Sequence, residues 1–490
     1  MATTKKKISG KDLGIKIFLI ATVVIIIAAI AFNMITSSGI LLHSFKPMTS
    51  ENYTVNAAMM NYFYKTSYYG FVNQMGDYLS YFGLDTSRPL DKQAYTEDMT
   101  WHDYFLSSTV SQVEEMLVLA ESARAEGIEL SADEIAGIDE TMASIAETAA
   151  AYNYPGVSAF LSAQYGAGIK EKDVRAAMEL SALATKYSQK ISDGITLTDD
   201  EINTYFDENR ETYTYVDLRQ FSFAATEAET ANATDEEKAQ LMAALKEKAE
   251  ALAACKTVAE FDAHLTEYMK GNVPEGVEIT EENIADNIES TKYTKYNSRE
   301  TEQGKWAFED GRKVGETFIV EDTEAVACIV YMMERTEYRD ETLTRDVRHI
   351  LFQSANHTDA DGAKAKAEEI LAEWEASAKT EDAFAELANK YSEDPGSNTN
   401  GGLYENVNEG EMVEEFDAWL FDAARKAGDV EIVETAQHGA HIMYYVGEGE
   451  PVWKLTVENA LKNEKYTAAY EALAEKVTVN VNETAAKLVG

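Results

Sequence analysis

Hydrophobic positions follow two different periods along this 490-residue chain. From Thr54 to Arg210, apolar residues recur at intervals of three and four, and the segment Trp101–Glu126 is typical of an amphipathic helix. In the last third of the chain, two short runs, Arg345–Phe352 and His441–Val446, have the composition of strands. Two amphipathic helical segments and a Gly401–Gly402 turn separate these runs. The pattern predicts an α+β protein in which a helical part precedes small sheets.

Several helix ends are marked by residues that can satisfy free backbone groups. Ser131 and Glu134 fit a capping box that begins a helix, and Thr198 and Glu201 repeat the pattern. Gly127 is placed to end the preceding helix. We therefore expect one helix to end near residue 127 and others to begin after Ser131 and Thr198.

The N-terminal residues have a pattern of their own, in which five lysines precede the apolar run Ile17–Phe32. Residues 13–35 approach the roughly 20 residues that span a bilayer. The lysines predict that residues 1–12 stay in the cytoplasm and that the rest of the chain lies outside. The alternative is a removable signal peptide, because Ala29–Ala31 fits a cleavage site. The first prediction is a single-pass anchor in the cell membrane with an extracytoplasmic chain.

An internal repeat links two later parts of the chain. Trp306–Gly315 matches Trp419–Gly428 without a gap, with Trp, Phe, Arg, Lys and Gly at the same positions. Val216–Phe223 likewise matches the opening strand of the later copy. We expect residues 211–336 and residues 340–448 to be two copies of one domain.

The two copies differ at polar positions. The alignment places Gln220 opposite His349 and Cys328 opposite His441, and it finds no counterpart of Gly401–Gly402 in the first copy. The scaffold residues are thus kept while the polar residues are lost. We expect the chemistry in the second copy and a structural or client-binding role for the first.

The second copy resembles the parvulin family of peptidyl-prolyl cis/trans isomerases. The resemblance rests on His349, the Gly401–Gly402 turn, Met412, Phe416 and His441, which follow one another in the family's order. It implies that each copy is a small antiparallel sheet covered by helices, and that the first copy is a degenerate parvulin domain. It also implies catalysis of rotation about X–Pro bonds, which is slow because of an amide barrier of roughly 18–20 kcal/mol.

The resemblance further implies roles for individual residues. His349 and His441 are expected to form a hydrogen-bonded pair at the centre of the sheet. Asp394 is expected as an acceptor next to the reacting carbonyl, and Thr435 as the hydroxyl that orients the pair. Since rotation of an amide needs neither a nucleophile nor a metal, no cofactor or metal is expected.

The apolar socket for the proline ring is expected from three further residues: Leu403, Met412 and Phe416. Met412 and Phe416 are four residues apart, which on a helix places both on one face. His438 and His441 have a spacing found in metal sites, but on a strand they point to opposite faces.

The sequence also departs from the family pattern. The usual Gly-Gly-Asp-Leu-Gly turn is here Gly401-Gly-Leu-Tyr-Glu405, and Glu415 replaces a proline before Phe416. Residues 353–362 contain no Lys or Arg. This argues against recognition of a phosphoserine before proline, which would require a basic cluster there.

The remaining segments resemble parts of larger foldases. Residues 36–210 resemble the N-terminal helical chaperone domain of PrsA-like and SurA-like proteins. Residues 449–490 form a C-terminal helical segment, which in PrsA-like relatives packs back onto the N-terminal domain. The alternative is a helix that covers only an edge of the last domain.

Composition narrows the function further. The formal net charge of −43 argues against nucleic-acid partners, whose phosphates would be repelled. Cys255 and Cys328 are the two cysteines of the chain, and their spacing suggests neither a disulfide framework nor a metal site.

We therefore predict an exported, membrane-anchored foldase and chaperone that isomerises X–Pro bonds in unfolded or partly folded exported polypeptides. The alternative is a non-enzymatic holdase that uses both parvulin-like copies as binding surfaces. A cell-surface adhesin built from repeats fits less well, because an adhesin does not require a histidine pair in one copy. Retention of the pair in one copy and its loss in the other favours the enzyme.

Overall fold

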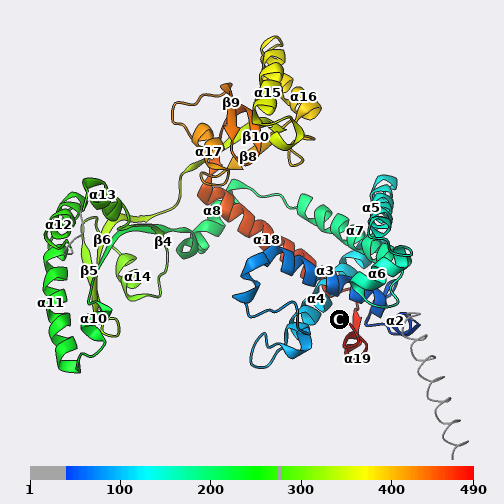
Figure 1. Cartoon of the computed structure of the whole chain (residues 1–490), viewed down its shortest axis with the longest axis horizontal. Helices are drawn as coiled ribbons and strands as arrows, with labels where there is room; N and C mark the ends of the chain where they lie inside the picture. The colour runs from blue at the N-terminus through cyan, green and yellow to red at the C-terminus, as the bar shows by residue number, and fades with distance from the viewer. Residues whose placement is uncertain (1–39, 274–278) are drawn as a thin grey trace, which may run out of the picture. The chain divides into compact units, whose positions relative to one another are not determined.

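The computed structural model describes residues 40–273 and 279–490 (Figure 1). The expected cytoplasmic tail, residues 1–12, and the expected membrane segment, residues 13–35, lie outside the described residues. Among the helices of the described ranges, none is long and apolar enough to cross a bilayer.

The described residues form two compact units. The first comprises residues up to 196 together with residues 462–490, and the second comprises residues 197–461. Residues 197–210, which the sequence assigned to the helical domain, thus group with the second unit. Their helix packs there through Phe206, whose ring lies 5.3 Å from that of Trp453.

The first unit is mainly helical. Its helices are α2 (Ile40–Ser44), α3 (Ala57–Met75), α4 (Trp101–Ala125), α5 (Ala132–Ala151), α6 (Val157–Tyr165), α7 (Glu171–Asp193) and α19 (Glu483–Ala486), with the 3-10 turns η1 (Gly76–Ser80) and η2 (Leu90–Lys92). The expected helix ends are confirmed. Gly127 adopts a φ of 71° just after α4, and α5 begins with the capping box of Ser131 and Glu134.

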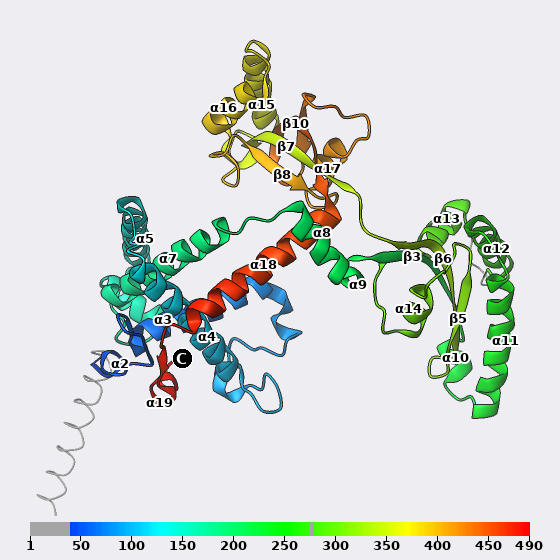
Figure 2. The same ribbon diagram turned by 180° about the vertical axis from the view of Figure 1, so that it is seen from behind.

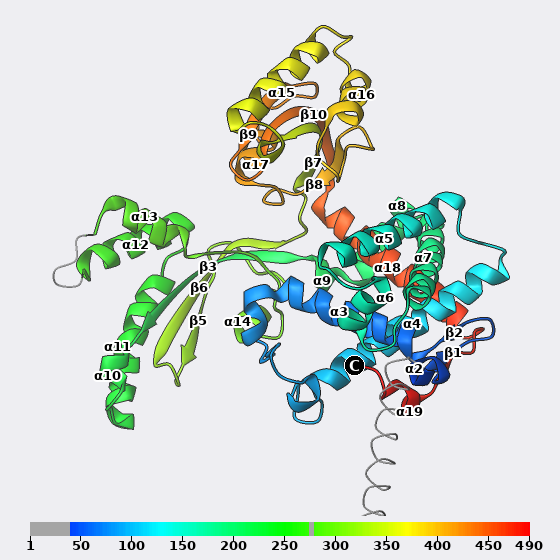
Figure 3. The ribbon, with the colours of Figure 1, turned by 45° about the vertical axis from the view of Figure 1, so that its right-hand side comes forward.

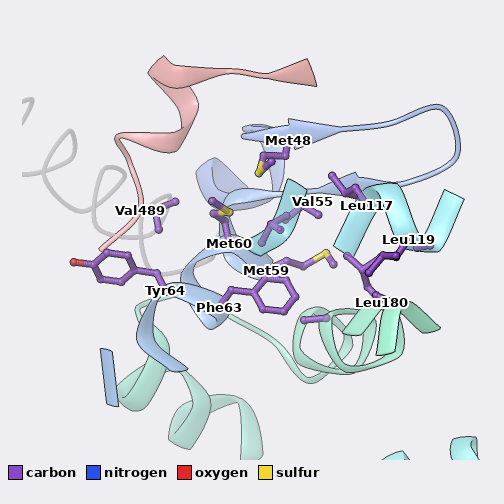
Figure 4. Packing of buried hydrophobic residues seen from close by; sticks show 14 of the residues in the cluster. Met48, Val55, Met59, Met60, Phe63, Tyr64, Leu117, Leu119, Leu180 and Val489 are labelled. Carbon is purple, nitrogen blue, oxygen red and sulfur yellow. The ribbon is translucent and has the colours of Figure 1, made fainter. Parts of the chain in front are cut away.

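A small sheet closes the first unit. It has the strand order β11-β1-β2 and consists of β1 (Met48–Thr49), β2 (Thr54–Val55) and β11 (Asn480–Val481). β11 pairs with β1 through Met48 and Val481, and Val489 lies in the same apolar core as Met60 and Tyr64 (Figure 4). The C-terminal residues therefore pack against the helical unit, as the resemblance to PrsA-like proteins implied.

The second unit contains two four-stranded antiparallel sheets. Its first part comprises α8 (Asp199–Glu208), α9 (Arg210–Tyr213), β3 (Tyr215–Ala224), α10 (Glu227–Thr230), α11 (Asp235–Ala253), α12 (Val258–Gly271), α13 (Glu281–Glu289), β4 (Lys292–Tyr296), α14 (Glu302–Ala307), β5 (Thr317–Asp322) and β6 (Ala327–Tyr338). We call residues 215–338 the first sheet region.

The rest of this unit repeats the arrangement. It comprises β7 (Leu343–Gln353), η3 (Ser354–Asn356), α15 (Ala360–Glu375), α16 (Glu381–Tyr391), β8 (Leu403–Val407), α17 (Glu414–Leu420), β9 (Val430–Thr435), β10 (Gly439–Pro451) and the start of α18 (Val452–Ala474). We call residues 343–451 the second sheet region.

Strand order is the same in both sheet regions. The first sheet runs β4-β3-β6-β5 and the second runs β8-β7-β10-β9, so each strand has a counterpart at the same place. In the first sheet region α11 and α14 lie on opposite sides of β5 (Figure 3). In the second, α15 and α16 pack on one face and α17 on the other (Figure 2).

Strand pairing corrects one position of the sequence alignment. Cys328, expected opposite His441, faces the helix-covered core with Phe223 and Val330, whereas His441 faces α17. The residue at the position of His441 is Ile329, one residue further along. The cause is the preceding turn, which has four residues between β5 and β6 but three between β9 and β10. An ungapped alignment hides this difference.

Candidate functional site

The two histidines lie side by side on the central strands of the second sheet region. His349 on β7 stands opposite Met443 on β10, and His441 on β10 stands opposite Leu351 on β7. Because strand side chains alternate between faces, both imidazoles point to the face that α17 covers. Both histidines are 4% exposed.

A continuous chain of polar contacts runs through this pair. Nδ1 of His349 lies 3.1 Å from Nδ1 of His441. On one side, Nε2 of His441 lies 3.1 Å from Oγ1 of Thr435. On the other, Nε2 of His349 lies 2.9 Å from Oδ2 of Asp394. The structure thus brings together the four residues that the sequence predicted as catalytic.

Backbone contacts hold Asp394 and the glycine turn against β7. The amide of Glu393 donates to the carbonyl oxygen of Leu351 at 2.9 Å, which brings the segment after α16 alongside His349. The amide of His349 itself donates to the carbonyl oxygen of Gly402 at 2.8 Å. Gly402 has a φ of 71°, and a Cβ there would lie 2.2 Å from the carbonyl oxygen of His349, so no other residue fits.

The charge of Asp394 is strongly stabilised. The pKa of its carboxyl group lies well below its usual value, chiefly because it accepts a hydrogen bond from His349, and hydrogen bonds from Ser397 and the amide of Gly396 add to this. Burial opposes the shift without reversing it. Asp394 is therefore an ionised acceptor at neutral pH.

Burial keeps His441 uncharged. It lowers the pKa of the imidazole to about 3, and the adjacent His349 adds to the effect. A neutral imidazole has one donor and one acceptor nitrogen, so the partners of His441 decide its tautomer.

An ionised Asp394 gives the chain of contacts a direction. Because a carboxylate only accepts, Nε2 of His349 must carry a proton. Because His441 is neutral, its two nitrogens take opposite roles: Nε2 accepts from the hydroxyl of Thr435, and Nδ1 donates to Nδ1 of His349. The amides of His438 and Gly439, each 3.3 Å from Oγ1 of Thr435, donate to that oxygen. Its own proton then goes to an acceptor, and Nε2 of His441 at 3.1 Å is nearer than the carbonyl oxygen of Gly439 at 3.4 Å.

An apolar cluster borders the histidine pair. Its buried members are Val347, Val407, Phe416, Trp419, Leu420, Met443 and Tyr445. The ring of Phe416 meets His349 and His441 edge to face, with centroid distances of 5.6 and 5.7 Å. Met412 packs against the cluster while remaining partly exposed.

The structure corrects how Met412 reaches this place. The sequence suggested that Met412 and Phe416 share one helix face, but α17 begins at Glu414 with Val413 as its N-cap, so Met412 precedes the helix. The loop before it is held by Asp417, which accepts from the amide of Gly410. Met412 belongs to the same cluster through the loop and not through helical spacing.

Leu403 is placed apart from the other predicted pocket residues. It pairs with Arg348 on β7, and successive strand residues face opposite sides, so it does not share the face of His349. The next residue, Tyr404, pairs with Val347 and packs against the apolar cluster.

Two polar residues of the site were missed in the sequence. The hydroxyl of Tyr404 donates to Oδ2 of Asp394 at 3.0 Å, and the fully buried Ser397 donates to the same oxygen at 2.5 Å. The replacement of the usual Gly-Gly-Asp-Leu turn by Gly401-Gly-Leu-Tyr404 was a signal for the tyrosine. Ser397 had no comparable signal.

The site combines an apolar surface with an ordered set of polar groups. In the described ranges, no three His, Cys, Asp or Glu side chains are grouped so that they could hold a metal ion. What the site offers is a dry apolar surface next to a directed chain of hydrogen bonds. Such a site can favour one conformation of an amide over another without making or breaking a covalent bond.

Comparison with known proteins agrees with this geometry. Residues 330–446 match the family described as PPIC-type PPIASE domain. Chaperone SurA of Alcanivorax borkumensis is 33% identical over 116 residues, which cover 24% of this chain and 26% of SurA. Foldase protein PrsA 1 of Listeria innocua is 27% identical over 171 residues, which cover 33% of this chain and 53% of that foldase. The chain thus spans about a quarter to a half of the length of these relatives.

Solved structures add two distant similarities. The crystal structure of the peptidylprolyl isomerase PrsA from Bacillus anthracis is 16% identical, covering 60% of this chain and 94% of that one, with a TM-score of 0.19. PrsA from Bacillus subtilis is 17% identical, covering 63% and 87%, also with a TM-score of 0.19. With its matched segment and its histidine pair, the chain carries a parvulin-type peptidyl-prolyl isomerase domain, and it is similar in sequence to the chaperone SurA and the foldase PrsA 1.

Proposed function

We propose that the chain is an exported foldase whose second sheet region catalyses cis/trans isomerisation of X–Pro bonds in unfolded polypeptides. The observation that carries the proposal is the unbroken contact chain Thr435–His441–His349–Asp394 beside the apolar cluster of Phe416. A structural role would not require four polar residues, three of them buried and Asp394 partly so, to be matched to one another. The identity with chaperone SurA and foldase PrsA 1 supports the same reading.

Catalysis would follow from differential binding. The proline ring would lie against Phe416 and Met412, while the twisted amide, whose charge is more localised than that of the planar amide, would be favoured by the fixed polar groups. Because the histidine chain is preorganised and largely dry, it needs little rearrangement when the bond rotates. In this proposal His349, His441, Asp394 and Thr435 act together as one network.

The cellular setting belongs to the same proposal. Residues 13–35 would anchor the chain in the cell membrane, and unfolded or partly folded exported proteins that contain proline would be the partners. The run of lysines followed by Ile17–Phe32 supports the anchor. The helical first unit would hold such clients while the second sheet region acts on their prolines.

The decisive test is isomerisation of a short X–Pro peptide, followed by exchange NMR with purified protein of residues 36–490. We expect acceleration by the parent, and a loss of at least about tenfold in kcat/KM, or about 1.4 kcal/mol, in His441→Ala. Met412→Ala should raise KM, because it trims a partly exposed side chain of the proline socket. Ile329→Ala, at the matching position of the first sheet region, is the control and should leave the rate unchanged.

Each alternative gives a different result. A parent that is silent towards the peptide but suppresses aggregation of an unfolded protein would support the holdase. An unchanged rate in His441→Ala would remove the histidine pair from the mechanism even if the parent is active.

A further inference from the structure

Tyr404 occupies a position that the sequence assigned to no function. It is the second residue of β8, opposite Val347, so its ring lies on the face of the histidine pair. The ring centroid is 5.3 Å from that of His349, and the hydroxyl oxygen is 3.0 Å from Oδ2 of Asp394. The side chain thus bridges the edge strand of the sheet and the end of the polar chain.

Tyr404 is held in its donating form. Burial and the charge of Asp394 raise the pKa of its hydroxyl to about 12. The phenol therefore stays protonated throughout the neutral range, and its single proton points to the carboxylate. A hydrogen bond to an ionised acceptor is about twice as strong as one between neutral groups.

Three side chains converge on a single oxygen. Oδ2 of Asp394 lies within hydrogen-bond distance of Nε2 of His349, Oγ of Ser397 and the hydroxyl of Tyr404, while Oδ1 accepts from the amide of Gly396. A carboxylate with this many donors is fixed in both charge and orientation. It is thus committed to the network and not free to turn towards a bound peptide.

We infer that Tyr404, with Ser397, is a positioning residue that fixes the proton arrangement of the histidine pair through Asp394. The two hydroxyls keep Oδ2 an acceptor, so His349 presents its Nε2 proton to Asp394 and turns its Nδ1 towards the Nδ1 proton of neutral His441. The donor and acceptor roles in every hydrogen bond from His349 to Thr435 depend on the contacts made at Asp394. The link to catalysis rests on the proposed isomerase function, whereas the proton arrangement itself does not.

The first sheet region supplies an internal control. Tyr293 pairs with Leu218 on β3 as Tyr404 pairs with Val347 on β7, so the two tyrosines occupy matching positions. Tyr293 is 44% exposed, and within the described residues its hydroxyl has no hydrogen-bond partner. A tyrosine at this place in the fold does not by itself require a role, and the contact with Asp394 is what distinguishes Tyr404.

The other titratable groups near Asp394 do not contact its carboxylate. The imidazole of His441 is the second ring of the pair, and the carboxylate of Glu393 turns away to accept from the amide of Gln353 at 2.7 Å and to meet Nε2 of His357 at 3.1 Å. His349 and Tyr404 therefore remain the titratable groups in direct contact with Asp394.

The test compares Tyr404→Phe with Tyr293→Phe in the protein of residues 36–490. Long-range ¹H–¹⁵N NMR reads the tautomers of His349 and His441, and ¹³C NMR reads the titration of Asp394. In the parent we expect His349 protonated at Nε2 and His441 at Nδ1. Tyr404→Phe should move the titration of Asp394 to higher pH by about one unit, with the tautomers mixing, and should lower kcat/KM by roughly tenfold or less.

The outcomes separate the positioning role from the proposed function. Unchanged tautomers and an unchanged Asp394 titration in both Tyr404→Phe and Ser397→Ala would overturn the inference. A change in the tautomers combined with no isomerase activity in the parent would keep the positioning role and remove the proposed function. Tyr293→Phe should alter none of the three signals, and an equal response to it would also overturn the inference.

Discussion

The two sheet regions of the second unit share a scaffold but differ in what stands at its centre. In both, an arginine packs over a tryptophan and donates through Nε to that tryptophan's carbonyl oxygen: Arg312 to Trp306 at 2.9 Å, and Arg425 to Trp419 at 3.1 Å. In both, the amide of the glycine that follows donates at 2.8 Å to the last strand. The repeated Trp, Arg and Gly residues therefore stabilise the scaffold and form no part of the site. We call this group of three residues the structural corner.

Among the residues that the structure describes, the polar network is found in the second sheet region alone. Gln220 replaces His349, and Ile329 replaces His441, so no paired imidazoles are possible in the first sheet region. Thr291 takes the place of Gly402, since the amide of Gln220 donates to the Thr291 carbonyl at 2.8 Å. Fold and site are thus separable, because the fold persists where both histidines and the glycine beside them have been exchanged.

The largest effect is expected from making the second sheet region resemble the first. His349→Gln reproduces Gln220 and removes both the ring–ring contact and the Nε2 donor to Asp394, so kcat/KM for an X–Pro peptide should fall at least about tenfold. The reverse change, Gln220→His, should create no activity of its own, because Ile329 cannot pair with it. Exchange NMR with the peptide measures both.

This comparison would fail if a chain carrying both substitutions, His349→Gln and Gln220→His, isomerised the peptide as fast as the parent. The first sheet region would then be able to act with one histidine, and the pair would not be the feature that matters.

Much of this architecture could be predicted from the sequence. The repeat was visible because the structural corner demands Trp, Arg and Gly at fixed offsets, and helix ends were visible because capping is local. The histidine pair was predicted from the resemblance to the parvulin family, which His349 and His441 carry among only seven histidines in the chain. These signals are either local or carried by unusual residues.

What could not be predicted depends on geometry beyond the local sequence. The position opposite His441 was misassigned because a turn longer by one residue changes the face of every following side chain. Leu403 and Tyr404 are neighbours, and strand register alone decides which of them meets His349. Ser397 reaches the site through the loop after α16, where no periodicity guides a prediction.

A second difference should appear when pH is lowered. His441 has a pKa of about 3 in the folded chain against 6.5 for a free imidazole, so unfolding takes up a proton within this window. The stability of the second sheet region should therefore fall as pH drops below 6.5, by up to about 1.4 kcal/mol per pH unit. Asp394 adds to the loss only below its unfolded pKa of 3.8.

His441→Ile, which reproduces Ile329, tests the origin of this acid sensitivity. In the parent, the free energy of opening measured by hydrogen exchange of the β10 amides should fall between pH 7 and pH 4.5. In the variant most of this pH-dependent fall should disappear, whatever the absolute stability of the variant. The amides of β6 in the same sample are the control. Equal acid sensitivity of β6 and β10 in the parent would assign the effect to the whole chain and not to the buried histidine.

The smallest effect concerns what the two sheet regions share. Arg312→Ala and Arg425→Ala each remove a guanidinium stacked on tryptophan and one hydrogen bond to a carbonyl, so each should destabilise its own region by about 1–2 kcal/mol. Arg→Lys at both positions keeps the charge but loses the planar stack, and should recover only part of the loss. Hydrogen exchange of β6 and of β10 reads the two regions separately. A loss confined to the second sheet region would mean that its corner supports the site as well as the fold, and the separation of scaffold from chemistry would no longer hold.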